Sequence, residues 1–431
     1  MSLVYARRGG GDTGGTDAIL DSTKNLLTGE NKFKSEYGSL TSLESDLLLL
    51  AAAVYSTDRC MKRGEREDSP RDIQLSVPAV NIGVLQPEIH RIEQILRKLS
   101  SDSWTVMLRQ VNGTVEKPNT QNTTSGKTLL FSGGLDSLAA AIDLGLAGEH
   151  LQLVSHITHN QPTAAAQEEL VEMMRSTLKL SFPHRRFLVS AKSTNPSPNL
   201  TFDAESSQRT RSFLFLTLAA LCARRVGHQN IVVIAENGQM AVHLPATEGR
   251  IGPFSTRTAH PEILQLMEQF LSSVLGISIK IDNPYLNRTK AEVILPVIQR
   301  LPAAVPLAVS CWKNARLSAG ATHCGFCIPC IIRRIAIETH ITDTTAYARD
   351  LFGENLSIAA VDDDDGRRNL IDYGLFARTI LDTPSSEASI TWPELISPCI
   401  SVADTMAMYI RAATEAQTVF AKYSSLGPLL T

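Results

Sequence analysis

The sequence contains no apolar stretch long enough to cross a lipid bilayer. Its longest apolar stretches, residues 47–55 and 213–222, have about half of the ~20 residues that a membrane-spanning helix needs. Arg7 and Arg8 are not followed by the apolar segment that a secretory signal contains. We therefore expect a soluble cytoplasmic protein without a membrane partner.

The sequence also lacks an excess of charge of either sign. Its 41 Lys and Arg residues nearly balance its 44 Asp and Glu residues, which leaves a formal net charge of −3 at pH 7. Nucleic-acid-binding proteins usually carry a basic surface, so we expect no nucleic-acid partner. Hydrophobic residues at 43% and charged residues at 20% are typical of a globular protein, and 431 residues suffice for two or three domains.

Cysteine is scarce, and its seven residues are an odd number. In a cytosolic chain this argues against a disulfide framework. Four of the cysteines lie within 20 residues of one another: Cys311, Cys324, Cys327 and Cys330. Four thiolates at this spacing are typical of a structural, tetrahedral Zn²⁺ site. An iron–sulfur cluster is the rival, but Arg334 stands where the bacterial ferredoxin pattern has a further cysteine. His323 could replace one cysteine as a ligand, although we expect it to be a neighbour of the metal.

Strand and helix patterns alternate through the middle of the chain. The predicted strands are residues 127–131, 151–156, 186–191, 231–235 and 277–281. The predicted helices between them are residues 137–144, 164–180, 207–226 and 261–275. This order predicts an α/β fold with a parallel sheet that helices cover on both faces. Such folds bind ligands beyond the C-terminal ends of their strands.

Other patterns flank this region and suggest further parts. We predict a flexible segment over residues 1–40, which holds a glycine-rich run, then a small α+β domain over 41–112 and a linker over 113–125. The main domain follows over 126–340, with the zinc motif at 311–330. Helical patterns predict a helical C-terminal region over 341–431, in which the acidic residues 362–365 form a solvated loop.

A glycine-rich loop joins the first strand of the main domain to its first helix. It reads Phe131-Ser132-Gly133-Gly134-Leu135-Asp136-Ser137. The two glycines permit a tight turn, and the start of the helix offers free N–H groups and a positive dipole to a phosphate. Ser132 and Ser137 add hydroxyl groups, and Asp136 can hold the Mg²⁺ that accompanies a nucleotide. The loop therefore predicts an anion site for phosphate or pyrophosphate, with Asp136 and Ser137 as candidate catalytic residues.

This loop resembles the PP-loop of the ATP pyrophosphatase superfamily, whose members cleave ATP between the α and β phosphates. Within it, residues 211–216, 283–293 and 310–333 resemble motifs of QueC, the 7-cyano-7-deazaguanine synthase. The resemblance covers about residues 126–340. It implies a C–N-bond-forming ligase that adenylates the carboxylate of 7-carboxy-7-deazaguanine and transfers it to an amine. The implied cofactors are ATP, Mg²⁺ and Zn²⁺.

The resemblance and the chemistry single out four further residues. Lys290 is a candidate catalytic residue that could neutralise phosphate charge, or a surface lysine of a helix. Arg211 and Arg257 could bind the substrate carboxylate or the ATP phosphates, or form structural salt bridges. Asn237 could read the purine-like edge of the substrate, or be a turn residue before Gly238.

The chain departs from QueC in its length and in two segments. Glu236-Asn237-Gly238 and residues 255–261 resemble the long QueC-like proteins of anti-phage systems, namely QatC and the QueC-like protein of type IV CBASS. This implies a defence setting in which the N-terminal amine of another protein is the acceptor. QueC itself uses ammonia and makes a nitrile, and that reaction is one alternative. A PP-loop tRNA-modifying enzyme and a nucleotide-binding scaffold of a defence complex are the others.

Overall fold

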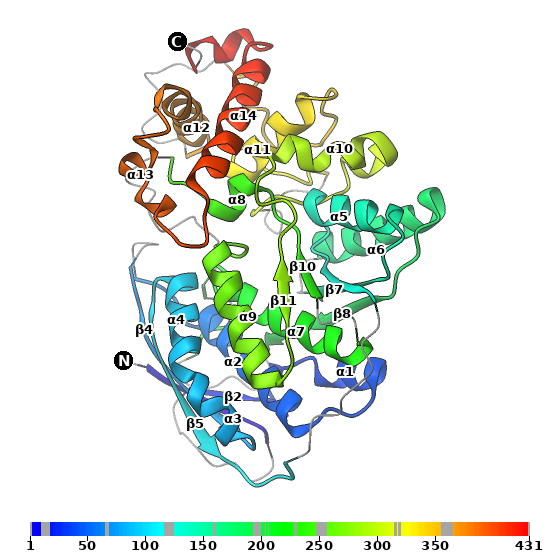
Figure 1. The fold of residues 1–431 in the computed structure, drawn as a ribbon, viewed down its shortest axis with the longest axis vertical. Helices are drawn as coiled ribbons and strands as arrows, with labels where there is room; N and C mark the ends of the chain where they lie inside the picture. The colour runs from blue at the N-terminus through cyan, green and yellow to red at the C-terminus, as the bar shows by residue number, and fades with distance from the viewer. Residues whose placement is uncertain are drawn as a thin grey trace.

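The structure is a computed structural model of the chain. It describes residues 2–9, 18–64, 69–115, 125–157, 161–192, 200–202, 204–205, 207–227, 231–246, 257–313, 317, 320–354 and 365–429. An N-terminal sheet, a central α/β domain and a C-terminal group of helices follow one another along the long axis of the molecule (Figure 1).

The N-terminal part is built on a parallel sheet with the strand order β2-β1-β4-β5. Its strands are β1 (Ser2–Arg7), β2 (Ala18–Asp21), β4 (Asp72–Ala79) and β5 (Ser103–Gln110). The helices α2 (Ser42–Cys60) and α4 (Ile89–Ser100) pack against β4 and β5, respectively. Exposed and buried residues alternate along the first half of β5, as expected for a sheet with one open face. Short elements complete this part: β3 (Leu26–Leu27), α1 (Glu30–Tyr37) and α3 (Ile82–Leu85).

Residues 1–40 differ from the predicted flexible segment. β1 lies inside the sheet, between β2 and β4, and β3 pairs antiparallel with β9 (Ser190–Ala191) of the central domain. The physical reason is burial, because Val4, Ala6 and Leu20 are fully buried in the core. Most of the predicted glycine-rich run lies outside the described residues, as does most of the predicted linker.

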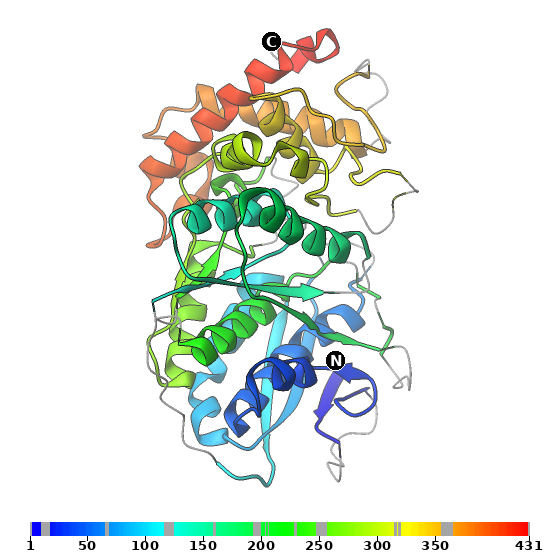
Figure 2. The ribbon, with the colours of Figure 1, turned by 90° about the vertical axis from the view of Figure 1, so that its right-hand side faces the viewer.

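The central domain confirms the predicted parallel sheet. Its strand order is β11-β10-β6-β7-β8, and every neighbouring pair is parallel. The strands are β6 (Lys127–Leu130), β7 (Leu151–Ile157), β8 (His184–Leu188), β10 (Ile231–Ile234) and β11 (Lys280–Asp282). The helices are α5 (Leu135–Leu146), α6 (Gln161–Leu178), α7 (Arg211–Val226), α8 (Gly238–Val242), α9 (Pro261–Leu275) and α10 (Lys290–Arg300). Figure 2 shows α5 and α6 on one side of the sheet and α7 on the other.

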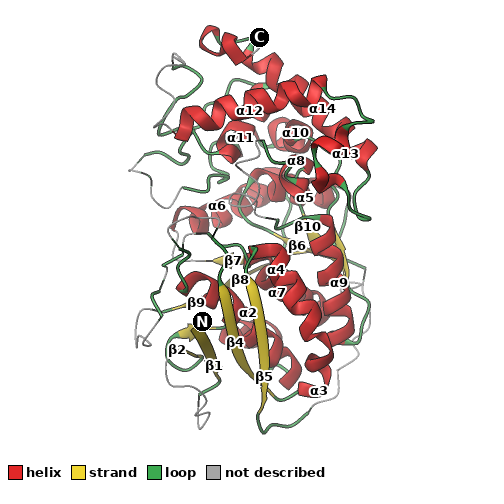
Figure 3. Cartoon of the chain, turned by 90° about the vertical axis from the view of Figure 1, so that its left-hand side faces the viewer, coloured by secondary structure: helices red, strands yellow, loops and turns green. Residues whose placement is uncertain are grey.

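The central domain is joined to both flanking parts through packed cores. On one side, α2 packs against α7 and α4 packs against α9 (Figure 3), and their apolar residues form one continuous core. On the other side, α11 (Ile328–Glu338), α12 (Asp365–Asp382), α13 (Ala388–Thr391) and α14 (Val402–Phe420) share a second core. The acidic run 362–365 lies outside the described residues or side chains. Among the described helices, none is both long enough and apolar enough to cross a membrane.

Candidate active site

The glycine-rich loop lies at the C-terminal end of the central strand β6, directly before α5. Gly133 has φ +83°, a conformation that side chains other than glycine rarely adopt. The hydroxyl of Ser137 accepts a hydrogen bond from the Ser132 N–H (3.3 Å) and donates one to the Gly134 carbonyl (3.0 Å), which closes the turn. As at the start of any α-helix, the first N–H groups of α5 have no hydrogen-bond partner earlier in the helix. The loop thus leads from β6 into the start of α5, the strand–loop–helix order that the sequence predicts.

Two of the predicted ATP-binding residues have side chains in the apolar core, which leaves only their backbone groups at the loop. Phe131 and Leu135 have buried side chains that belong to the apolar core around α5 and α10. Ser132 is exposed, and its hydroxyl lies 3.2 Å from that of Ser137. The polar groups at the loop surface are therefore backbone amides and the Ser132 side chain.

Asp136 is the centre of a buried charged cluster. Its Oδ1 lies 2.6 Å from the Nζ of Lys290, and both side chains are buried. Its Oδ2 accepts hydrogen bonds from the side-chain amide of Asn237 (2.8 Å) and from the backbone N–H of Asn237 (3.3 Å). The structure thus brings together three residues that the sequence singled out separately.

Glu236 is a fourth member of this cluster, and the sequence analysis did not select it as a site residue. The amide of Asn237 donates to its Oε1 at 3.1 Å as well as to Asp136, so one side chain holds both carboxyl groups. The available signal was its place two residues after the end of β10, at the edge of the sheet where the glycine-rich loop also lies. Gly238 follows, and a Cβ there would lie 2.1 Å from the Leu286 carbonyl, so only glycine fits.

The two carboxyl groups have opposite pKa shifts. Burial raises the pKa of Asp136, but the Lys290 ammonium and hydrogen bonds from Glu236, Lys290 and Asn237 outweigh it and hold this pKa below its usual range. Burial and the negative charge of Asp136 raise the pKa of Glu236 well above its usual value. The surroundings therefore favour the ionised form of Asp136 and the protonated form of Glu236.

Lys290 is positioned by the first turn of α10. Thr289 caps this helix in a reciprocal pair with Glu292. The Lys290 N–H donates to Oε1 of Gln239 at 3.0 Å, and Gln239 is itself buried in α8. Both ends of the Lys290 residue are therefore fixed, its backbone by Gln239 and its ammonium by Asp136.

Arg211 is the first residue of α7, and its guanidinium stacks on Phe215 with Cζ 4.5 Å from the ring centre. Phe215 also packs against the ring of His156, and the His156 carbonyl accepts from Gln167, which donates to the Ser132 carbonyl as well. A short series of contacts thus joins Arg211 to the glycine-rich loop. Within the described part of the chain, no carboxylate pairs with Arg211 and its buried Nε has no hydrogen-bond partner. Burial lowers its pKa, and nearby Arg59 lowers it further.

Arg257 lies before α9, close to His243 and His260. Burial and the Arg257 charge together lower the pKa of each histidine to about 4. His260 caps α9 by accepting the Glu262 N–H at 3.3 Å, so its role there is structural. The contacts of the described residues do not join Arg257 to the glycine-rich loop.

The four clustered cysteines form a buried group whose sulfur atoms all lie within 4.8 Å of one another. The Cys324–Cys330 and Cys327–Cys330 sulfur separations are 3.8 and 3.4 Å. A tetrahedral Zn²⁺ with bonds of ~2.3 Å has sulfur separations of about 3.8 Å, so the donor set fits zinc. Backbone N–H groups of Lys313, Cys324 and Cys327 donate to sulfur atoms at 3.3 Å, which suits thiolates.

His323 and Arg333 connect this cysteine cluster to the glycine-rich loop. His323 is not a member of the cluster, because its Nε2 accepts the Ser310 N–H at 3.1 Å. The buried Arg333 donates to the carbonyls of Ala308 (3.0 Å) and Val305. The adjacent Val309 N–H donates to the Gly133 carbonyl at 2.9 Å. Residues 308–310 thus contact His323 and Arg333, which lie next to the cysteine cluster, and they also contact Gly133 of the glycine-rich loop.

Many α/β folds place a glycine-rich loop at the C-terminal ends of their strands. Comparison with known families distinguishes between them. Residues 127–340 match the family described as queuosine biosynthesis protein QueC. The chain contains a QueC-like PP-loop domain. The matched family implies use of ATP and chemistry of the 7-cyano-7-deazaguanine synthase type, with C–N bond formation, for this domain. No curated protein matched the chain.

The match to QueC includes the glycine-rich loop and ends just beyond the cysteine cluster. The β1–β5 sheet and helices α12 to α14 lie outside the matched residues. The QueC-like domain therefore carries the whole charged cluster, whereas the flanking parts are additions to it.

Proposed function

We propose that this protein uses ATP to adenylate the carboxylate of 7-carboxy-7-deazaguanine and transfers the acyl group to an amine. The observation that carries the proposal is the Asp136–Lys290 pair beside a PP-loop in a QueC-like domain. A carboxylate is a poor acyl donor, and an acyl-adenylate has a good leaving group.

In the first step, a carboxylate oxygen of the substrate attacks the α-phosphorus of ATP and pyrophosphate leaves. The N–H groups at the start of α5 and the Ser132 hydroxyl bind the departing pyrophosphate. Lys290 offers positive charge to the phosphates, and Asp136 would hold the Mg²⁺ that accompanies ATP. Ser137 keeps the PP-loop closed through its two hydrogen bonds.

Arg211 is the proposed partner of the substrate carboxylate. A guanidinium that is largely desolvated and has no carboxylate partner among the described residues is unfavourable by itself, and an anionic ligand would compensate it. Arg257 is the second proposed anion-binding residue, beside α8. We assign Asn237 to positioning, in place of the substrate contact expected from the sequence, because its amide already donates to Asp136 and Glu236.

In the second step, the amine attacks the acyl carbon, AMP leaves with the bonding electrons, and the amine loses a proton. We propose that the acceptor is an amine of another protein and that the setting is anti-phage defence. The long chain, with folded parts on both sides of the QueC-like domain, and the segments at Glu236 and residues 255–261 support this choice over ammonia.

Mass spectrometry of the reaction products tests the proposal. The protein is incubated with ATP, Mg²⁺ and 7-carboxy-7-deazaguanine, with either ammonium or a lysate of the native host. A lysate protein that gains the mass of the acyl-deazaguanine supports protein modification, and a free amide or nitrile base supports the ammonia-dependent alternative. AMP formation that does not depend on the deazaguanine would contradict the substrate assignment.

A further inference from the structure

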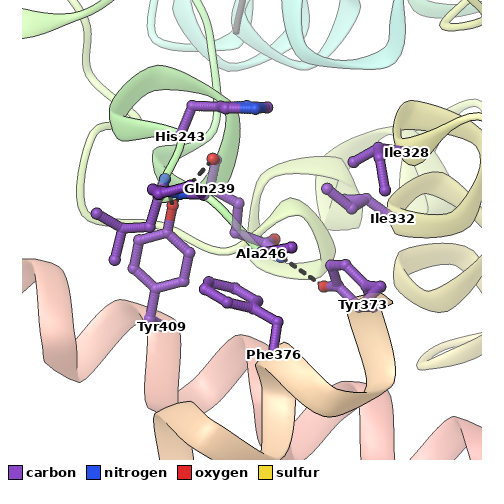
Figure 4. Close-up of a pocket in the computed structure, with 10 residues that line it drawn as sticks. Gln239, His243, Ala246, Ile328, Ile332, Tyr373, Phe376 and Tyr409 are labelled. Carbon is purple, nitrogen blue, oxygen red and sulfur yellow. Dashed lines mark hydrogen bonds between the residues drawn. The ribbon is translucent and has the colours of Figure 1, made fainter. Parts of the chain in front are cut away.

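A pocket lies beside the charged cluster, between the QueC-like domain and the C-terminal helices (Figure 4). It encloses about 530 Å³, including its opening to solvent. The side that belongs to the QueC-like domain is formed by α8 with the residues that follow it, and by Ile328 and Ile332 of α11. The opposite side is formed by Tyr373 and Phe376 of α12 and Tyr409 of α14.

The chemistry of the lining selects an uncharged, apolar occupant. The lining holds no Asp, Glu, Lys or Arg residue. The Tyr373 hydroxyl accepts a hydrogen bond from the Gln239 amide at 3.0 Å. The Tyr409 hydroxyl accepts the Leu244 N–H at 3.0 Å and donates to the Gln239 carbonyl at 3.1 Å, so it is fully engaged. The other lining side chains are apolar apart from His243, so the side-chain groups left to a ligand by the described contacts are the Tyr373 O–H and the His243 ring. These are fewer than the donors and acceptors that the hydrogen-bonding edge of a guanine-like base needs.

Gln239 connects the pocket to the proposed reaction site. Its side-chain nitrogen faces Tyr373 in the pocket wall (Figure 4), and its side-chain oxygen accepts the N–H of Lys290. Lys290 in turn contacts Asp136 next to the PP-loop. A group in the pocket is therefore separated from the charged cluster by a single side chain.

Part of the pocket lining comes from outside the QueC-like domain. Tyr373, Phe376 and Tyr409 lie outside the residues that match QueC, so the family domain by itself lacks this side of the pocket. The proposed function places ATP at the PP-loop and the carboxylate of the base at Arg211, both within the residues that match QueC. The amine is the remaining reactant, so we assign to it the group that contacts Tyr373, Phe376 and Tyr409.

We propose that this pocket binds an apolar side chain next to the acceptor amine and so selects an amino-terminal residue over ammonia. The inference rests on the proposed function and names the acceptor class of the same site. The occupant is the uncharged aliphatic or aromatic side chain of the residue that carries the reactive amine.

Small amines test this inference directly. The protein is assayed with ATP, Mg²⁺, 7-carboxy-7-deazaguanine and one of four acceptors: ammonium, glycinamide, leucinamide or phenylalaninamide. We expect kcat/KM for leucinamide or phenylalaninamide to exceed that for glycinamide by about tenfold or more, because burial of one apolar side chain contributes that much. Equal use of the amides by the wild-type protein would overturn the inference.

A pocket-filling variant separates the acceptor from the other substrates. Ala246, which is only partly buried in the pocket wall, is changed to Phe, and the smaller change Ala246→Leu serves if Ala246→Phe fails to fold. We expect the preference for apolar amides to disappear while ammonium-dependent product formation and substrate-dependent ATP–pyrophosphate exchange stay unchanged. The matched control is Ala407→Phe, at an exposed position of α14 outside the pocket.

The outcomes distinguish this inference from the proposed function. Loss of exchange in Ala246→Phe to the same extent as loss of amide formation would assign the pocket to the base or nucleotide and overturn the inference. Exchange without acyl transfer to any of the four amines would support adenylation and contradict the acceptor pocket. Absence of substrate-dependent exchange in the wild-type protein would contradict the proposed function itself, and the inference with it.

Discussion

The ammonium of Lys290 lies 2.6 Å from Oδ1 of Asp136, although 154 residues separate the two in the sequence. The pair is buried where β6 runs into α5 and where α10 begins. Its members come from two different motifs of the QueC-like domain. The contact therefore joins the PP-loop to the segment that carries Lys290, and both segments belong to the same candidate site.

Replacement of Lys290 by Met is expected to leave a buried, unpaired carboxylate. We expect the free energy of unfolding to fall by about 3–5 kcal/mol and substrate-dependent ATP–pyrophosphate exchange to fall by about 10²–10³-fold. Urea unfolding and the exchange assay measure the two effects. The double variant Lys290→Met with Asp136→Asn is the control, and it should recover stability but not exchange. Exchange at the wild-type rate in Lys290→Met would contradict a role of this residue in the site.

Replacement of Arg211 by Met separates anion binding from a structural role. Since this guanidinium has no carboxylate partner among the described residues and lies near Arg59, its removal should leave the thermal midpoint unchanged or raise it. The KM for the deazaguanine should rise by about 10–150-fold, as expected for a lost hydrogen bond to a charged group. A lowered thermal midpoint with an unchanged KM would show that Arg211 is structural.

The dependence of stability on pH reports on Glu236. A carboxyl group whose pKa is raised in the folded protein contributes stability below its unfolded pKa, and this contribution is lost as the pH rises through the folded pKa. We therefore expect the free energy of unfolding to decline less steeply as the pH rises above about 5 in Glu236→Gln than in the wild-type protein. Glu169→Gln, at an exposed position of α6, is the matched control. Parallel curves for Glu236→Gln and the wild-type protein would refute the raised pKa.

The four-cysteine cluster predicts one zinc ion per chain. Cys324→Ser should lose this metal and lower the thermal midpoint by about ten degrees or more, because a structural metal contributes folding energy. It should also slow exchange, since residues 308–310 connect the cluster to Gly133. Metal analysis by mass spectrometry and thermal unfolding measure these effects, with Cys399→Ser outside the cluster as control. Iron in place of zinc, with visible absorption, would identify the rival iron–sulfur cluster.

The central fold was predictable because local patterns and tertiary packing agree there. Helix α9 spans the residues that its pattern predicts, and its ends are marked by Pro261 and by Gly276. The predicted flexibility of the first 40 residues came from the glycine-rich run at residues 9–15. Strand β1 instead is stabilised by pairing with β4, more than 60 residues later. Pairing between distant segments leaves no local signal.

Most residues of the candidate site could be predicted from the sequence, but the contacts between them could not. Asp136, Lys290 and Asn237 each belong to a recognisable segment, but the sequence does not show that one amide connects two carboxyl groups. Glu236 was missed because its role depends on burial beside Asp136, which only the fold creates. The pocket next to Gln239 was also invisible, since its walls come from helices more than 100 residues apart.

The central claim is that the substrate carboxylate attacks the α-phosphorus of ATP at the PP-loop. Isotope transfer tests it most directly: 7-carboxy-7-deazaguanine with ¹⁸O in both carboxylate oxygens is incubated with ATP, Mg²⁺, an amine and the wild-type protein. The account predicts AMP that carries one ¹⁸O atom, and no such AMP with Asp136→Asn. Unlabelled AMP, or ADP with ¹⁸O in inorganic phosphate, would show that the carboxylate is not adenylated and would contradict the account.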